Sequence, residues 1–525
     1  MSYRVVIPTA GTGSRLGMLT KHLNKSLVSI AHRPTLSHLI EQFPEDCEFV
    51  IALGHKGELV REFLELAYPH RTFFFAEVDP YEGTGSGLGY SMLCCSDYLQ
   101  QPFLFLSCDT LVQEAIPSPD HNWMGYAERP DLSAYRTLEI NDGHVRSIRE
   151  KGEAGLNLQA YIGLAGIHDY KTFWDAMRSG GDLAVATGEA HGMRSLLGDG
   201  FIAGHGFTWY DTGNPEALAQ TRDVYREDHE PNILEKEHEA IWFVGDRVIK
   251  FSTDRSFIAN RVARVRELDG YVPEIVGARS HMYCYRKIDG TILSEAITLP
   301  LFERLLNRCQ EFWRPVELQI GQNEKFLELC RRFYKDKTEE RVALFYKNFN
   351  CADGCEPING EQMPSLKDLL AEIDWDGLSC GLPGRFHGDF HFENILWSEP
   401  EQRFAFIDWR QDFGGDLAIG DIYYDLAKLM HGLIVSHELI HRDQYSVKWE
   451  ADSIHFDLHR KHVLVECEAY FNEWCLRNGY DLKKIRILTA LIYLNIAALH
   501  HYPYSLTLYA LGKRMLKLEM EKLWK

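Results

Sequence analysis

The chain has 525 residues, of which 45% are hydrophobic and 25% are charged. That length predicts two or three domains, and the composition is typical of a globular protein with ample apolar material to bury. The formal net charge of -20 argues against nucleic acids and anionic membranes as partners, because both would require a basic surface.

The first residues, MSYRVVIPTAG, lead directly into an apolar segment that is typical of a strand, without the pattern of a secretion signal. The most apolar late segment, Ile487 to Leu499, is shorter than the roughly 20 residues that span a bilayer, so we expect a buried helix and no membrane insertion. The 12 cysteines follow no repeated zinc-binding spacing, and we expect reduced thiols in a cytoplasmic protein.

From residue 1 to about residue 225, short apolar runs such as RVVIP, FVIALG and FLFLSC alternate with amphipathic helical stretches. This alternation predicts βαβ units and a mostly parallel, Rossmann-like sheet covered by helices. The highly charged stretch from Gln220 to Glu239 then predicts a connection between domains.

The second half begins with IWFVGDRVIKF, which predicts a β-hairpin around a Gly-Asp turn. A helical stretch (SFIANRVARVREL), a second strand pair (HMYCYRKIDGTILSEA) and a mainly helical remainder follow. We therefore predict an α/β protein in which a domain of residues 1–225 is fused to a bilobal α+β domain of residues 235–525. Its small lobe should cover about residues 235–298 and its helical lobe about residues 299–525.

A glycine-rich loop follows the first predicted strand, in PTAGTGSRLGMLTKHLNKSL. It contains Gly11, Gly13, Ser14 and Arg15, and Lys25 comes ten residues later. Glycines at this place let backbone N–H groups approach a phosphate chain, and the two cations can offset the charge of a triphosphate. A tight turn without a ligand would use the same glycines.

Two acids downstream support a ligand site. Asp109 ends the apolar run FLFLSC, where open α/β sheets bind their ligands, and Asp211 lies in the turn-rich TWYDTGNPEAL. Together these carboxylates can hold Mg²⁺ between a triphosphate and an acceptor, whereas each alone can simply cap a helix or a turn.

These residues together resemble the nucleotidyltransferases that make nucleotide sugars and nucleotide amino alcohols, over nearly all of residues 1–225. The resemblance implies nucleotide binding by Gly11, Gly13, Ser14 and Arg15, catalysis by Arg15 and Lys25, and Mg²⁺ held by Asp109 and Asp211. It also implies nucleotide contacts from Gly83, Thr84 and Gly85, acceptor contacts from Glu150 and Lys151, and a further family element in YIGLAGI. Asn24 departs from the proline of many sugar enzymes, and NKSL leans towards the amino-alcohol cytidylyltransferases.

The segment FHGDFHFENILW, Phe386 to Trp397, concentrates polar groups that no core strand or helix would use. Zinc on His387, Asp389 and His391 is one interpretation, but H-x-x-x-H on a strand or loop does not bring its ligands together. Phosphoryl transfer requires an acid that orients a hydroxyl, an amide for Mg²⁺ and a second acid on a nearby strand. Asp389, Asn394 and, in FAFIDW, Asp408 meet that requirement.

The order H-G-D-x-H-x-x-N, then I-D-W and GDIYYDLAKL, resembles the aminoglycoside phosphotransferase and choline kinase group over about residues 235–525. The resemblance implies Asp389 as the catalytic base, Asn394 and Asp408 as metal ligands, and Lys250, at the end of DRVIKF, as the phosphate anchor. It also implies a hinge beside adenine in YRKIDG and structural roles for His387 and Asp425. No glycine-rich segment precedes the hairpin, and Glu267 is the nearest acid that could pair with Lys250.

Aromatic residues in the helical half allow two interpretations, a cage for a quaternary ammonium ion or ordinary core packing, and their helical spacing favours the core. They are Trp409, Tyr423, Tyr424, Trp449, Tyr470, Phe471, Trp474 and Tyr493.

The two resemblances together imply a bifunctional enzyme with Mg²⁺ as its cofactor. It would phosphorylate a small hydroxyl metabolite with ATP and then transfer a nucleotidyl group from an NTP, with CTP as one candidate. The product would be a nucleotide-activated sugar or polyol for capsule or other cell-surface glycan synthesis. The alternatives are a choline kinase joined to a CTP:phosphocholine cytidylyltransferase, and a nucleotide-binding regulatory protein without turnover.

Overall fold

The computed structural model describes residues 3–198, 201–226, 236–450 and 453–521. The chain forms two compact units, one of residues 1–258 and 276–287 and the other of residues 259–275 and 288–525. Residues 227–235, the middle of the predicted connection, lie outside the described residues. The predicted α/β class, with a Rossmann-like first part and a kinase-like second part, is confirmed.

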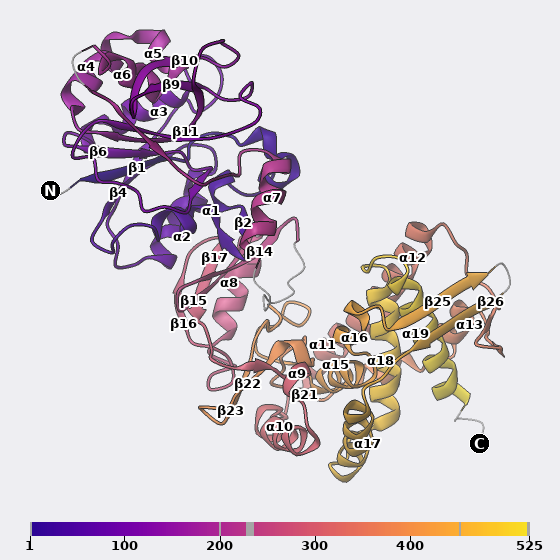
Figure 1. Ribbon diagram of the computed structural model, residues 1–525. Coiled ribbons are helices and arrows are strands. Elements are labelled where there is room, and N and C mark those ends of the chain that lie inside the picture. Colours follow the sequence, from indigo (N-terminus) through magenta and orange to yellow (C-terminus); the bar gives the residue numbers. More distant parts are fainter. Residues whose placement is uncertain (1–2, 199–200, 227–235, 451–452, 522–525) are drawn as a thin grey trace. The chain divides into compact units, whose positions relative to one another are not determined.

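The first unit is built around a nine-stranded sheet (Figure 1). Strands β1, β4, β5 and β6 run parallel, whereas β11 is antiparallel to both β6 and β8. The sheet is therefore mixed, and the prediction of a mostly parallel sheet is wrong. In spatial order the strands are β5 (Phe73–Glu77), β4 (Glu48–Leu53), β1 (Arg4–Pro8), β6 (Phe103–Leu106), β11 (Leu158–Ile167), β8 (Trp123–Ala127), β12 (Ala203–Gly206), β10 (His144–Arg149) and β9 (Thr137–Asn141).

Helices cover both faces of this sheet, which is why β1 reads as an uninterrupted apolar run. Val5 and Ile7 of β1 belong to one hydrophobic cluster and Val6 to another. Helix α2 (Gly57–Ala67) contributes Phe63 to the first cluster. The other face is covered by α3 (Leu88–Cys95), α4 (Tyr170–Ser179) and α6 (Glu189–Ser195).

A second, four-stranded sheet belongs to the same compact unit. Its order is β14 (Glu239–Val244), β15 (Arg247–Ser252), β17 (Met282–Arg286) and β16 (Ile275–Ala278). The predicted hairpin IWFVGDRVIKF is confirmed as the antiparallel pair β14 and β15. The second predicted strand pair is wrong, because β18 (Thr291–Ile292) pairs with β22 (Ile395–Ser398) rather than with β17. Gly290 permits this pairing, since a Cβ there would lie 2.9 Å from the Trp397 carbonyl oxygen.

The small sheet packs against helix α2 through a shared core. The ring centroids of Trp242 and Phe63 are 5.3 Å apart, and Trp242 is fully buried. Arg279 pairs with Glu65 at 2.8 Å, and the His281 backbone N–H donates to Glu62. The predicted boundary near residues 225–235 therefore separates segments that the compact unit holds together.

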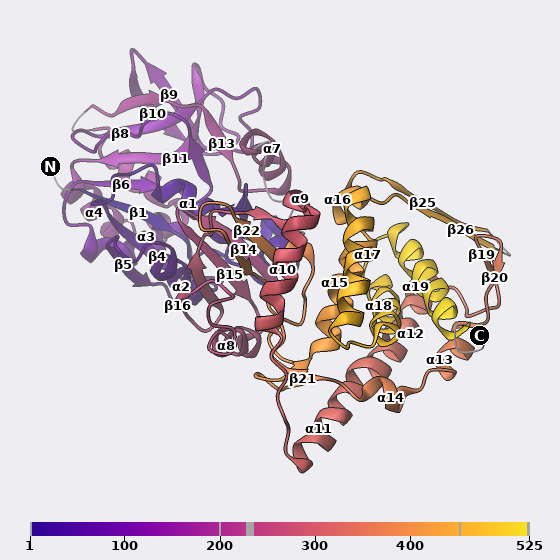
Figure 2. The same ribbon diagram turned by 90° about the horizontal axis from the view of Figure 1, so that it is seen from below.

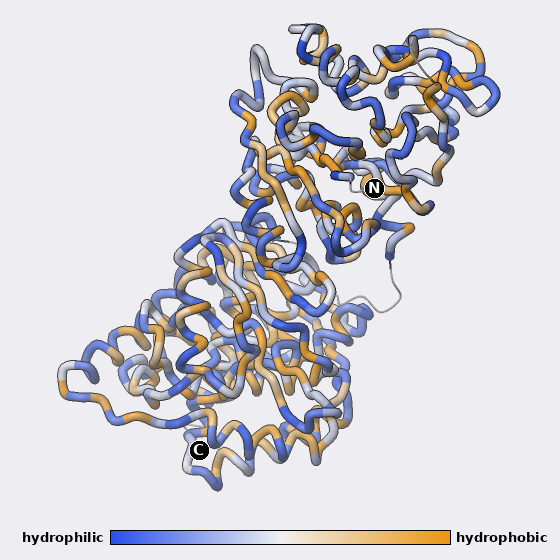
Figure 3. The backbone as a smooth tube through the Cα atoms, turned by 90° about the vertical axis from the view of Figure 1, so that its left-hand side faces the viewer, coloured by the Kyte–Doolittle hydropathy of each residue, from blue (hydrophilic) through white to orange (hydrophobic). Residues whose placement is uncertain are grey.

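The second unit is mainly helical (Figure 2). Its longest helices are α10 (Leu299–Phe312), α11 (Ile320–Arg331), α12 (Lys337–Phe349), α15 (Ile422–Ile434), α17 (His462–Arg477), α18 (Leu482–Ala497) and α19 (Tyr504–Glu521). The apolar segment expected to form a buried helix does so in α18, where Ala490 and Tyr493 are fully buried. Hydrophobic and hydrophilic residues alternate along the tube in the helices of this unit, as in amphipathic helices (Figure 3).

A short hairpin, β22 and β23 (Arg403–Phe406), carries the polar motifs of the second half at its ends. A separate four-stranded sheet contains β19 (Pro357–Ile358), β20 (Glu361–Gln362), β25 (Tyr445–Glu450) and β26 (Ser453–Leu458). Among the described residues, no helix has the length and apolarity needed to cross a bilayer. All twelve cysteines are free thiols.

Candidate active sites

In the first unit, the glycine-rich loop follows β1 and leads to Lys25. Gly13 has a φ of 66°, and a Cβ at this residue would lie 2.8 Å from the Lys25 Cβ. Only glycine combines that backbone conformation with such a close approach. Gly11, Ser14 and Arg15 are exposed. The loop is therefore shaped by its contact with Lys25 and leaves its outer face accessible.

Asn24, the departure from proline noted in the sequence, is fully buried and ties this loop together. Its amide nitrogen donates to the carbonyl oxygens of Thr9 (2.9 Å) and His55 (2.7 Å). Its amide oxygen accepts from the Ser26 backbone N–H (2.9 Å) and thereby caps the turn that contains Lys25. A proline side chain could form none of these hydrogen bonds, so the Asn24 side chain fixes the position of Lys25 by contacts that the proline-containing enzymes lack at this residue.

Lys25 and Asp109 form an ion pair of 3.2 Å. Burial alone would raise the pKa of Asp109, but Lys25 and a 2.5 Å hydrogen bond from Ser107 lower it to about 2. The same pairing raises the pKa of Lys25 against the effect of its burial. Both side chains therefore stay charged over the physiological pH range.

Asp211 completes an acidic cradle. It lies at the end of β13 (Trp209–Asp211), whose partner β7 (Thr110–Val112) begins directly after Asp109. An ideal Cβ on Gly213 would lie 3.1 Å from Asp211 Oδ1, 3.2 Å from Asp109 Oδ2 and 3.4 Å from an Arg15 guanidinium nitrogen. Burial and then the nearby Asp109 carboxylate raise the pKa of Asp211. The two carboxylates thus face one small space, which suits a divalent cation with oxygen ligands.

A cavity of about 230 Å³ opens beside this cradle. The predicted residues Arg15, Asp109, Asp211 and Lys151 line it. Tyr135, Arg136 and Glu189 also line the cavity, but the sequence did not predict them because they share no recognisable motif. Tyr161 and Gly163, from the predicted YIGLAGI segment, line it as well.

Two other predicted groups lie elsewhere in the first unit. Glu150 pairs with Arg136 (3.1 Å) and Arg194 (2.5 Å), and it is absent from the residues that line the cavity. Gly83, Thr84 and Gly85 form an exposed loop before α3 and do not line the cavity either. Acceptor binding by Glu150 and nucleotide binding by the three loop residues stay predictions.

In the second unit, the loop that carries Asp389 is held by buried polar groups. His387 is fully buried, donates from Nε2 to the Ile407 carbonyl oxygen (2.9 Å) and accepts the Asp389 backbone N–H at Nδ1. Asp425 accepts the backbone N–H groups of His387 (2.6 Å) and Gly388 (2.7 Å). These contacts are those expected of the structural roles predicted for His387 and Asp425.

Asp389 itself forms an ion pair with Lys428 of α15 at 2.8 Å. Its burial would raise its pKa, but Lys428 and then His391 hold the pKa of Asp389 well below its ordinary value. The Asn394 side-chain nitrogen donates to the Asp389 backbone carbonyl (2.9 Å) and carboxylate (3.2 Å). Asp389 and Asn394 are therefore held together by hydrogen bonds within the loop.

Asp408 follows β23 with a φ of 59°, an unusual conformation for a residue with a side chain. Its carboxylate pairs with Arg261 of α8 (Arg255–Arg264) at 3.2 Å. Arg264 of the same helix is fully buried and donates to the Phe386 carbonyl oxygen at 2.6 Å. Helix α8 thus contacts both motifs of the second site, a relation that the sequence spacing did not reveal.

The zinc hypothesis on His387, Asp389 and His391 is not supported, because both ring nitrogens of His387 are bonded to the backbone. A different group, His391, Glu393 and His437, brings ligand atoms within 4.8 Å of one another. The His391 Nδ1–H donates to the Glu393 carboxylate at 2.8 Å, and the carboxylates of Asp389 and Glu393 raise the pKa of His391 to about 9 against the effect of burial. Its contacts are explained by these two neighbouring acids.

Lys250 lies in β15 of the first compact unit and is 5% exposed. The predicted hinge, Tyr285 to Gly290, connects β17 to β18. Glu267, the acid suggested as a partner for Lys250, lies beyond the end of α8 and is exposed. The role of Lys250 as a phosphate anchor stays a prediction.

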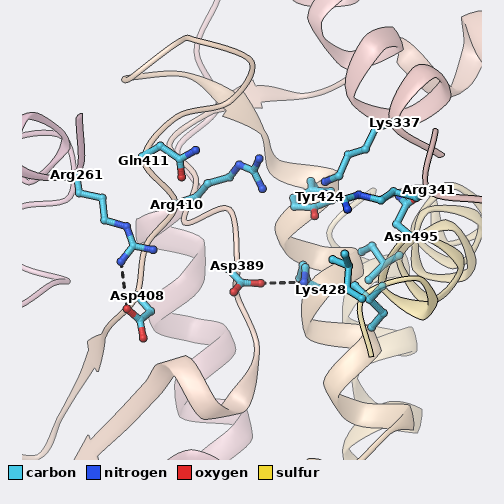
Figure 4. A pocket seen from close by; sticks show the side chains of 13 residues that line it. Arg261, Lys337, Arg341, Asp389, Asp408, Arg410, Gln411, Tyr424, Lys428 and Asn495 are labelled. Carbon is cyan, nitrogen blue, oxygen red and sulfur yellow. Dashed lines mark hydrogen bonds and ion pairs between the residues drawn. The ribbon is translucent and has the colours of Figure 1, made fainter. Parts of the chain in front are cut away.

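A cavity of about 280 Å³ surrounds Asp389 and Asp408 (Figure 4). Besides these acids, its lining contains five cationic side chains, which are Arg261, Lys337, Arg341, Arg410 and Lys428. Of the aromatic residues named in the sequence, Tyr424 alone belongs to the lining, and Trp409 is fully buried with its N–H bonded to the Arg261 carbonyl. No aromatic cage forms in the lining of this cavity.

Comparisons with known proteins agree with the two-part pattern. Residues 359–452, which contain Asp389, Asn394 and Asp408, match the Phosphotransferase enzyme family. The low-salt glycan biosynthesis nucleotidyltransferase Agl11 of Haloferax volcanii is 25% identical over 247 residues, which cover 42% of this chain and 66% of that protein. The glucose-1-phosphate cytidylyltransferase of Salmonella typhimurium is 26% identical over 176 residues, which cover 28% of this chain and 68% of that protein.

The bifunctional protein GlmU of Methanocaldococcus jannaschii is 30% identical over 111 residues, 21% of this chain and 25% of that protein. Among solved structures, the CTP:phosphocholine cytidylyltransferase of Streptococcus pneumoniae covers 43% of this chain and 100% of its own, with 16% identity and a TM-score of 0.36. The chain thus spans less than two thirds of the length of Agl11 and about a quarter of that of GlmU. The predicted resemblance is confirmed in both parts: the chain joins a half that is similar to nucleotidyltransferases to a segment that matches the Phosphotransferase enzyme family.

Proposed function

We propose that this protein is a bifunctional enzyme that first phosphorylates a small hydroxyl metabolite and then couples the product to a nucleotide. One observation carries the proposal: each compact unit holds an ion pair between a lysine and an aspartate, and this aspartate lines a cavity together with a second aspartate. These are Lys25 and Asp109 with Asp211, and Lys428 and Asp389 with Asp408. A binding protein without turnover would have no need for both sets.

In the first step, the acceptor oxygen attacks the γ-phosphorus of ATP, Asp389 accepts the hydroxyl proton, and ADP leaves. Lys428 orients the Asp389 carboxylate and keeps it ionised. In the second step, an oxygen of the new phosphomonoester attacks the α-phosphorus of an NTP, and the bond to the β-phosphate breaks to release pyrophosphate. Arg15 and Lys25 would offset the charge of the phosphates in that step.

Mg²⁺ fits the donor sets of both sites. Asp109 and Asp211 would hold it in the first unit, and Asn394 and Asp408 in the second, all with the hard oxygen ligands that Mg²⁺ prefers. The bound ion would supply positive charge against the phosphates of the nucleotide. The space beside Gly213, which a Cβ would fill, supports this assignment in the first unit.

The names of the relatives support a sugar or polyol as the acceptor, because Agl11 is described as a glycan biosynthesis nucleotidyltransferase and the Salmonella protein as a glucose-1-phosphate cytidylyltransferase. The product would then be a nucleotide-activated sugar or polyol for surface glycan synthesis. The nucleotide used in the second step, with CTP or another NTP as candidates, belongs to the same proposal.

Two variants test the division of labour. We expect Asp109→Ala to abolish pyrophosphate release while ADP formation stays largely intact, because the altered carboxylate lies in the first unit alone. Asp389→Asn should do the opposite. The assays are pyrophosphate detection with the four NTPs and pooled sugar phosphates, and ADP detection with pooled sugars and polyols. Loss of both activities in one folded variant would contradict the two-site proposal.

A further inference from the structure

The cavity around Asp389 and Asp408 has a charge opposite to that of the whole chain. Its lining contains five cationic side chains and two acidic ones, although the formal net charge of the protein is -20. Two of the cations are neutralised within the site, Lys428 by Asp389 at 2.8 Å and Arg261 by Asp408 at 3.2 Å. The other three, Lys337, Arg341 and Arg410, form no ion pair with any described residue.

These three side chains are positioned rather than loosely exposed. Lys337 and Arg410 both lie over the ring of Phe333, at 4.3 Å and 4.9 Å from its centroid. Arg341 follows Lys337 by one helical turn in α12, so both project from the same face of the helix. All three are partly buried. Fixed and partly desolvated cations without a carboxylate partner are costly unless a ligand supplies the opposite charge.

The electrostatics of neighbouring groups agree with this geometry. Burial would raise the pKa of Tyr424, yet Lys337, Lys428 and Arg410 lower it below its ordinary value. Burial lowers the pKa of Lys337, and Arg410, Lys428 and Arg341 lower it further. The cavity is therefore a region of positive potential in which the cations repel one another.

Two of the three cations, Lys337 and Arg341, lie on the acceptor side of the proposed reaction, and Arg410 lies above Asp389 in the view of Figure 4. In Figure 4, Asp389 stands between Asp408 with Arg261 on one side and Lys428, Arg341 and Asn495 on the other. If Asp408 holds the nucleotide phosphates through Mg²⁺, the group beyond Asp389 faces the molecule that is phosphorylated. The Asn495 amide oxygen is buried there without a hydrogen-bond partner among the described residues, and it can accept a hydrogen bond from a hydroxyl group of a polyol.

We propose that the acceptor of the kinase half carries an anionic group, a carboxylate or a phosphate, in addition to the hydroxyl that is phosphorylated, and that Lys337, Arg341 and Arg410 bind this group. The inference rests on the proposed function and specifies its substrate class. It excludes choline, whose quaternary ammonium would meet three unpaired cations and no aromatic cage. The anion also explains why the cations lie near the catalytic base, since a bound anion fixes the distance of the acceptor hydroxyl from Asp389.

The turnover test uses the full chain and a matched set of acceptors that differ at one carbon. Glucose, glucuronate and glucose 6-phosphate carry a hydroxyl, a carboxylate and a phosphate at that carbon, and choline is the cationic comparison. We expect ADP formation with an anionic member to exceed that with glucose and choline, and the two anionic members distinguish carboxylate from phosphate. Faster turnover of glucose or choline than of both anions would overturn the inference while leaving the proposed kinase function intact.

Variants show which residues bind the anion. Lys337→Gln and Arg341→Gln should each raise the KM for the anionic acceptor about tenfold or more, because each removes a charge-assisted hydrogen bond. The KM for ATP should stay unchanged. Lys347→Gln removes the same charge from an exposed residue of the same helix and should alter neither value. A rise in the KM for ATP instead would assign these cations to the nucleotide and overturn the inference.

A binding measurement decides the matter even if none of these acceptors is turned over. Calorimetric titration of inorganic phosphate, with Mg-ADP saturating the nucleotide site, should detect one binding event that Arg341→Gln weakens at least tenfold and Lys347→Gln leaves unchanged. Absence of that event, or its persistence in Arg341→Gln, would overturn the inference. Failure of the proposed function has a different signature: phosphate binds, but ADP formation in Asp389→Asn equals that of the wild type with every acceptor.

Discussion

Among the individual residues, Asp389 and Asp408 lie in one cavity but have different partners. We therefore expect their substitutions to have different effects on Mg-ATP binding and on turnover. Asp389→Asn should leave Mg-ATP binding nearly unchanged and reduce turnover by roughly 10²–10⁴-fold, because it removes proton acceptance. Asp408→Ala should weaken Mg-ATP binding as well, by removing a carboxylate ligand. Calorimetric titration with Mg-ATP and an ADP assay on both variants test this.

His391→Ala is the comparison for that pair. His391 contacts Glu393 and the Asp389 carboxylate, but the proposed mechanism gives it no metal to hold, so its loss should be milder than either change. Stoichiometric zinc that is lost in His391→Ala, or near-normal phosphorylation by Asp389→Asn, would contradict the assignment of Asp389 as the base.

Asp425 gives a pH-dependent prediction. Burial raises its pKa from 3.8 to about 6, so the folded state binds a proton more tightly than the unfolded chain. Its contribution to stability is therefore fully present below pH 3.8 and is lost as the pH rises through about 6. The difference in Tm between the wild type and Asp425→Asn should shrink between about pH 4 and 6 and stay constant above that range. A constant difference throughout would show that Asp425 does not titrate there.

Among the secondary-structure elements, the turn between β13 and α7 (Pro215–Tyr225) is decisive for the first site. Gly213→Ala places a methyl group 3.2 Å from Asp109 Oδ2 and 3.1 Å from Asp211 Oδ1 without a demand on the backbone, since its φ is not in the left-handed region. We expect a raised Mg²⁺ requirement for pyrophosphate release, a normal Tm and unchanged ADP formation.

The control for Gly213→Ala is a Gly→Ala change outside the cavity at a glycine without a positive φ, which excludes positions such as Gly143 with a φ of 75°. A Cβ on Gly198 would meet none of the described atoms within 4 Å, and Gly198 does not line the cavity, so Gly198→Ala serves instead. Normal Mg²⁺ dependence in Gly213→Ala would contradict the assignment of the two carboxylates to a shared cation.

For the molecule as a whole, the shared core of the first unit bears on how the chain can be divided. The sequence predicts that a chain ending near Arg226 and one starting near Pro231, outside the described residues, each fold and keep one half-reaction. The structure leads to a different expectation, because a cut there removes Trp242 and its neighbours from the core around Phe63. Residues 1–226 should therefore melt at a lower temperature than residues 1–287.

Trp242→Ala tests the same contact in the full chain. Truncation of a fully buried Trp side chain should destabilise the first unit by about 3–5 kcal/mol, with Trp242→Phe closer to the wild type. Thermal loss of pyrophosphate release measures the effect. Equal melting temperatures for residues 1–226 and 1–287, together with a neutral Trp242→Ala, would restore the sequence-based boundary.

Features that depend on local order along the chain could be predicted without a structure. Alternating apolar and amphipathic segments predicted the α/β first half, and the spacing from His387 to Asn394 predicted a polar loop that carries Asp389 and Asn394. In the structure, the Asn394 side chain donates to the Asp389 carboxylate. Lys25, Asp109 and Asp211 were identified by their positions after strands, and they come together in the structure. Such patterns are predictable because strand ends and short loops fix their neighbours within a few residues.

Which distant residues meet depends instead on tertiary packing. Lys337 and Arg341 of α12, Arg410 after β23 and Lys428 of α15 come from three separate segments with no shared motif, and tertiary packing brings them together in the lining of one cavity. Glu150, identified by resemblance, turned out to pair with Arg136 and Arg194. A sequence gives the number of charged residues but not their positions in space. A binding site depends on which charged side chains lie close together and which of them already form ion pairs.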